Sequence, residues 1–162
     1  SGEATVRKNK SGIVVKGLHD LAVRFSRCCN PVPGDEIVGF VTRGRGVSIH
    51  RTDCINVINL PQEERARLID AEWQVAETAG STEQYSTEIQ IFANNRIGMF
   101  ADISKVFTEK QIDITSMNVR TSKQGKATII MTFDIHGTEE LNRITDKIRQ
   151  IEGVLDIQRT TG

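Results

Sequence analysis

The chain has 162 residues, and its 21 Lys and Arg residues balance 21 Asp and Glu residues, so the formal net charge is zero. This balance, with a hydrophobic fraction of 38%, indicates a globular protein of one or two domains. It excludes a uniformly basic nucleic-acid-binding chain and an acidic solvating tail. The sequence has no apolar run near the roughly 20 residues of a membrane span and opens with no signal peptide, so we expect a cytoplasmic protein without a membrane partner.

The charges are distributed unevenly along the chain. Residues 1–60 carry nine basic and five acidic residues, residues 61–84 carry two and six, and residues 85–162 carry ten of each. All three cysteines lie in the basic segment, and a stretch of small residues begins at Ala79. The sequence therefore predicts two modules in a piece excised from a longer protein. We expect a Ser-Gly cleavage scar and lead-in over 1–11, a cysteine module over 12–79, a linker over 80–84 and a second module over 85–162.

The second module alternates between the period of a strand and the period of a helix. The pattern predicts a strand over 85–93, a helix over 100–110, strands over 112–121 and 127–135, a helix capped by Thr138 and a strand over 154–157. The order β-α-β-β-α-β is the ferredoxin-like arrangement. With a small β-rich cysteine module before it, the fold class is α+β. The third strand has no aromatic residue before Phe133, so it lacks the stacking platform of an RNA-recognition domain.

The most specific motif of the chain is a vicinal pair of cysteines followed by His-x-x-x-Cys. Cys28, Cys29, His50 and Cys54 provide three thiols and one imidazole, the composition of a structural zinc site. Strands over 37–42 and 47–50 form a hairpin in this interpretation, and Asp53 caps a short helix. Three alternatives stay open: buried reduced thiols beside a partnered histidine, a nucleophilic cysteine with the histidine as base, and a thiol redox switch.

Five arginines surround this motif and indicate a contact with RNA phosphates. Two of them lie on a glycine-rich hairpin tip, where backbone can approach a phosphate closely. The alternative is that these charges only keep a hairpin solvated. The predicted RNA-contact residues are Arg24, Arg27, Arg43, Arg45 and Arg51.

The run from Cys28 to Gly39, continued by 42–51 and 53–56, resembles the conserved-cysteine or zinc-finger domain of long RelA/SpoT-type stringent-response proteins. In that family an ACT domain follows, as in this chain. The resemblance implies a parent protein that makes (p)ppGpp from ATP and GTP or GDP, or hydrolyses it, in N-terminal domains. This chain matches none of those catalytic centres and is expected to be non-catalytic. It would instead sense the ribosome, its RNA and tRNA, control its own N-terminal catalytic domains, and hold a structural zinc at the four ligands.

The stretch 95–103 resembles the ACT-domain signature, in which the first turn often binds an amino acid between paired domains. A glycine lets backbone approach a ligand, and amides at a helix start can hold a carboxylate. The alternative is that Gly98 only makes a tight turn. The alternative function is therefore an amino-acid-binding ACT homodimer, specific for a branched-chain amino acid, with a structural cysteine module. Its ligand residues would be Asn95, Arg96, Ile97, Gly98 and Met99.

Overall fold

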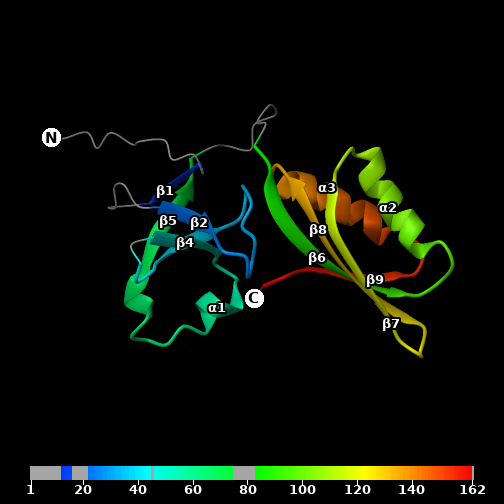
Figure 1. Cartoon of the computed structure of the whole chain (residues 1–162), viewed down its shortest axis with the longest axis horizontal. Coiled ribbons are helices and arrows are strands. Elements are labelled where there is room, and N and C mark those ends of the chain that lie inside the picture. Colours follow the sequence, from blue (N-terminus) through cyan, green and yellow to red (C-terminus); the bar gives the residue numbers. More distant parts are fainter. Residues whose placement is uncertain (1–11, 16–21, 45, 75–82, 162) are drawn as a thin grey trace. The chain divides into compact units, whose positions relative to one another are not determined.

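The computed structural model describes residues 12–15, 22–44, 46–74 and 83–161. The chain divides into two compact units, residues 1–80 with 161–162, and Ser81–Thr160 (Figure 1). The expected lead-in over 1–11 and most of the expected linker over 80–84 lie outside the described residues.

The described part of the first unit is a five-stranded sheet in the order β1-β5-β3-β4-β2. The β3–β4 pair is the hairpin expected from the sequence, with Val38 opposite His50. Strand β2 pairs with the other side of β4 and runs parallel to it. Ile13, Val47, Ile49 and Ala71 form the buried core of this sheet. The elements are β1 Ile13–Val15, β2 Ala22–Phe25, β3 Ile37–Val41, β4 Gly46–Arg51, α1 Ile55–Ile58, the 3-10 turn η1 Arg65–Arg67 and β5 Leu68–Trp73.

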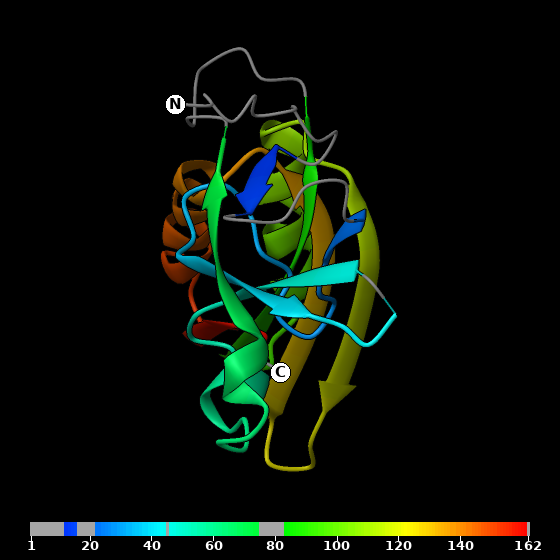
Figure 2. The ribbon, with the colours of Figure 1, turned by 90° about the vertical axis from the view of Figure 1, so that its left-hand side faces the viewer.

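The second unit has the expected β-α-β-β-α-β order. Its four strands form an antiparallel sheet in the order β7-β8-β6-β9, and both helices lie on one face of it (Figures 1 and 2). Phe107 from the first helix packs edge-on against Phe133 from the central strand β8, with ring centroids 4.8 Å apart. The elements are β6 Tyr85–Asn94, α2 Met99–Glu109, β7 Ile114–Thr121, β8 Lys126–Ile135, α3 Thr138–Arg149 and β9 Val154–Arg159.

Both helix caps expected from the sequence are wrong by one residue. Cys54, not Asp53, is the N-cap of α1, and no side chain caps that helix. Gly137, not Thr138, is the N-cap of α3, and a glycine has no side chain with which to cap the helix. The carboxylate of Glu140 instead accepts a hydrogen bond from the backbone N–H of His136 at 3.2 Å. Among the described helices, none combines the length and apolarity that a membrane crossing requires.

Gly153, between α3 and β9, is predicted to tolerate alanine much less well than Gly125 in the β7–β8 turn. Both have positive φ, 96° and 76°, so alanine costs backbone strain of roughly 1–2 kcal/mol at either position. Only at Gly153 would the new Cβ also lie 3.1 Å from the backbone carbonyl oxygen of Asn94 at the end of β6, as well as 2.7 Å from the Cε of the buried Met99, whereas Gly125 has open space. Overpacking adds about 1–3 kcal/mol.

Hydrogen exchange of the β8 amides in each variant measures this difference. We expect faster exchange in Gly153→Ala than in Gly125→Ala, by roughly tenfold or more. Equal exchange rates in the two variants would contradict the packing at Gly153.

Candidate metal centre

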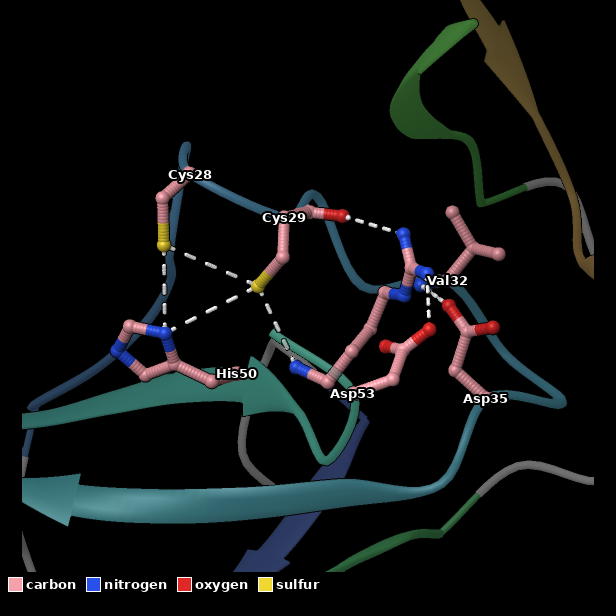
Figure 3. Close-up of polar contacts among 7 residues, drawn as sticks. Cys28, Cys29, Val32, Asp35, His50 and Asp53 are labelled. Atoms are coloured by element: carbon pink, nitrogen blue, oxygen red, sulfur yellow. Dashed lines mark hydrogen bonds and ion pairs between the residues drawn. The ribbon is translucent and has the colours of Figure 1, made fainter. Parts of the chain in front are cut away.

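Four potential ligands converge in the first unit from three segments of the chain. Cys28 and Cys29 lie in the turn after β2, His50 lies near the end of β4, and Cys54 is the residue before α1. Their ligand atoms all lie within 4.8 Å of one another. The Cys28 Sγ is 3.4 Å from the His50 Nδ1 and 3.4 Å from the Cys54 Sγ. The Cys29 Sγ is 3.8 Å from the same nitrogen and 4.0 Å from the Cys28 Sγ (Figure 3).

The four separations of 3.4–4.0 Å are close to those around a four-coordinate metal ion, and the remaining pairs of ligand atoms lie within 4.8 Å. A tetrahedral ion with metal–sulfur bonds of about 2.3 Å holds its ligand atoms about 3.6–3.8 Å apart. Cys29 and Cys54 are buried, and Cys28 and His50 are half-buried. Three thiols and one imidazole complete a tetrahedron and leave no open position for a substrate. The cluster can therefore hold a metal ion in a structural role.

A tight turn brings the two neighbouring cysteines to the same side. The backbone N–H of Asn30 donates to the Ser26 carbonyl at 3.0 Å, and Asn30 adopts a φ of 47°. Asparagine is among the residues that tolerate this left-handed conformation. The turn therefore spans Ser26 to Asn30 and is complete before Pro31.

The loop after the turn is closed by its own hydrogen bonds. The Asp35 carboxylate accepts from the backbone N–H of Val32 at 2.8 Å, and the Asp35 N–H donates back to the Val32 carbonyl at 3.0 Å. The indole N–H of Trp73 in β5 donates to the Asp35 carbonyl at 3.0 Å, and its ring stacks on Phe25 in β2. The loop that carries the cysteines is thus tied to two strands of the sheet.

The orientation of the histidine is fixed by a residue that the sequence argument missed. The Ser48 hydroxyl lies 3.2 Å from the His50 Nε2, because side chains two apart on β4 share a face. With the Nε2 proton donated to this hydroxyl, the Nδ1 lone pair faces the three sulfurs. The sequence signal for this contact was a serine two residues before the histidine within a predicted strand, which places both side chains on one face.

The protonation tendencies of the cluster favour metal binding at two of its four groups. Burial lowers the pKa of His50, so its ring is neutral. Burial raises the pKa of Cys29 and of Cys54. Burial acts in the same direction on Cys28, but hydrogen bonds, of which that of the Ser26 hydroxyl is the largest, outweigh it and lower the Cys28 pKa overall. A neutral imidazole and a thiolate are the forms that bind metal.

The five arginines predicted to contact RNA have different environments. Arg24, Arg27 and Arg43 are exposed, and Arg43 forms a long ion pair of 3.7 Å with Glu64. Arg45 lies outside the described residues. Arg51 is only 5% exposed, and its guanidinium bonds groups within the cysteine module. The prediction of an RNA contact at Arg51 is therefore wrong, because its charge is not available at the surface.

Comparison with known proteins matches both units to described families. The model of the RelA/SpoT RIS domain matches residues 13–74, and that of an ACT domain matches residues 81–159. The GTP pyrophosphokinase of Streptomyces coelicolor is 41% identical over 93% of this chain, and that of Escherichia coli is 37% identical over 96%. The chain belongs to the RelA/SpoT family. It spans only 17% and 20% of these two relatives and corresponds to their C-terminal regulatory part, with a RIS and an ACT domain and without the catalytic domains.

A solved structure is also similar to the second unit. The ACT domain from the GTP pyrophosphokinase of Chlorobium tepidum, determined by solution NMR, covers 49% of this chain and 89% of its own. The two share 23% identity, with a TM-score of 0.43.

The turn of the ACT domain that was predicted to bind an amino acid is held by its own arginine. The Arg96 Nε donates to the Glu152 carbonyl at 2.9 Å, and its Nη2 donates to the Asp102 carboxylate at 2.8 Å. Gly98 has a φ of 84° and is the N-cap of α2, while Ile97 is fully exposed. These contacts favour the tight-turn alternative, since Arg96 joins this turn to the segment before β9.

Replacement of Arg96 by alanine is expected to destabilise the ACT domain. The variant loses bonds to Glu152 and Asp102, and a net contribution of about 0.5–1.5 kcal/mol per hydrogen bond predicts a loss of roughly 1–3 kcal/mol. Hydrogen exchange of the β6 amides measures the change, with the exposed Arg120→Ala as the control. Exchange that is equally slow in both variants would contradict the structural role of Arg96.

Proposed function

We propose that this chain is the region through which a GTP pyrophosphokinase or (p)ppGpp hydrolase senses the state of the ribosome and its tRNA. In this proposal the chain restrains or releases N-terminal catalytic domains of its parent protein. The observation that carries the proposal is the succession of a RIS and an ACT domain, which aligns over more than nine tenths of the chain with the GTP pyrophosphokinases and covers at most a fifth of their length.

We further propose that the ion held by the cysteine cluster is zinc. Zinc favours tetrahedral sites of three cysteines and one histidine, and such closed sites stabilise small domains. Support comes from the composition of the cluster, its separations and the Ser48 contact that orients His50. When bound, zinc would supply folding free energy rather than chemistry.

The zinc content of the protein after incubation with a zinc salt and removal of unbound zinc by desalting tests this proposal. We expect about one zinc per chain in the wild type and a large loss in His50→Asn, while the exposed His136→Asn serves as the matched control. Zinc should also slow alkylation of the three thiols, and a chelator should restore it. If the wild type holds no more zinc than His50→Asn, and if a chelator leaves the rate of thiol alkylation unchanged, the result would support buried reduced thiols instead.

The exposed arginines of the RIS domain are the proposed contacts to ribosomal RNA. Arg24, Arg27 and Arg43 are exposed on the same unit, and residues 1–60 carry nine basic against five acidic residues. Phosphate contacts from arginine depend on charge and release counterions from the RNA. The net charge of zero for the whole chain therefore does not oppose a local RNA contact.

Reversal of Arg43 and Arg45 to Glu is expected to weaken co-sedimentation of the chain with ribosomes. The slope of log affinity against log salt concentration should fall by about one for each phosphate that the variant no longer neutralises. The matched control reverses Arg143 and Lys147 on α3, which changes the net charge equally. Unchanged binding of the Arg43 and Arg45 variant, or an equally weakened control, would overturn this RNA contact.

A further inference from the structure

Arg51 is a buried arginine located between two ligands of the metal cluster in sequence. It is the last residue of β4, directly after His50 and three residues before Cys54. Only 5% of the residue is exposed. A buried guanidinium is costly unless its charge and its donors are paired, so its contacts indicate what holds it there.

Both ends of Arg51 contact Cys29. The backbone N–H of Arg51 donates to the Cys29 Sγ at 3.3 Å, and the guanidinium Nη1 donates to the Cys29 carbonyl at 3.2 Å. One residue therefore fixes both the sulfur and the backbone of the same ligand. In extended backbone the side chain of Cys29 would point away from that of Cys28. The turn conformation that brings both sulfurs to one side therefore has to be held at Cys29.

The guanidinium is itself held by a carboxylate. Its Nη2 donates to the Asp53 Oδ2 at 2.6 Å, and Asp53 directly precedes Cys54. Arg51 thus links the cysteine turn after β2 to the residue before the last ligand. The planar fork of arginine can serve two acceptors in fixed directions, which a lysine cannot do.

We propose that Arg51 is the positioning residue of the metal centre, setting its affinity by holding Cys29 in the geometry required for metal binding. This role rests on the proposed function of the cluster as a metal site. Outer-shell partners of metal ligands typically alter affinity by about 10–100-fold when they are replaced. The Arg51 side chain acts on affinity through its hydrogen bonds to the Cys29 carbonyl and to Asp53. The hydrogen bond from the backbone N–H to the Cys29 sulfur is kept when the side chain is replaced.

Titration of the full chain with Co²⁺ alone tests the proposal, because the absorption of cobalt reports both occupancy and coordination by thiolates. Arg51→Met removes both side-chain bonds and keeps much of the apolar stem. Arg51→Lys keeps the positive charge but loses the planar guanidinium. It tests the positioning role if the methionine variant does not fold. Arg120→Met, at an exposed position of β7, is the matched control. We expect Arg51→Met to bind Co²⁺ about 10–100-fold more weakly than the wild type, Arg51→Lys to fall between them, and Arg120→Met to be unchanged.

Thermal unfolding followed through Trp73, the single tryptophan, separates positioning from general stability. A positioning role reduces the rise in midpoint that Co²⁺ produces, because that rise depends on affinity. A merely structural role lowers the midpoints with and without Co²⁺ alike and leaves the rise unchanged. Equal Co²⁺ affinity in Arg51→Met, Arg51→Lys and wild type, or an unchanged rise, would overturn the proposal. Wild-type protein that binds no Co²⁺ would instead overturn the metal site itself.

Discussion

The first unit depends on the convergence of three thiols and one imidazole from three separate segments. The pairing of β3 with β4 places His50, a left-handed residue at Asn30 turns the vicinal cysteines to one side, and the segment after β4 returns Cys54 to the same point. Three thiols this close repel one another once they ionise, since like charges in a partly buried site are unfavourable. A cation at the centre would remove this repulsion, so in the proposed function the local fold and a bound ion would support each other.

The two units differ in what holds them together. The ACT domain has a continuous core between its sheet and two helices, including the fully buried Ile89, Met131 and Ile144. The described residues of the RIS domain include two separate buried clusters, and one of them consists of Cys29, Cys54 and Val57. Small domains with limited cores usually need a staple such as a metal ion or disulfides. In this domain two of the four candidate ligands, Cys29 and Cys54, are themselves part of the core, so binding of an ion there would affect packing as well as coordination.

The sequence predicts those features that leave a local pattern. Alternation and helical spacing identify the ferredoxin-like order of the second unit, and the ligand types identify the cluster. The parallel pairing of β2 with β4 has no such signal, because β2 has four residues and its partner begins more than twenty positions away. Arg51 was predicted to contact RNA because it lies beside the cysteine motif in sequence. Its place was decided by the carbonyl of Cys29 and by Asp53, two acceptors that only the tertiary structure brings within reach.

X-ray absorption spectroscopy of the zinc-loaded chain tests the central claim most directly, because it reports the atoms bound to the ion. The four converging residues predict a shell of three sulfurs at about 2.3 Å and one nitrogen at about 2.0–2.1 Å. Substitution of His50 by asparagine should remove the nitrogen contribution. A shell dominated by oxygen and nitrogen, or one with fewer than three sulfurs, would show that the cluster does not hold the ion as a unit and would contradict the account.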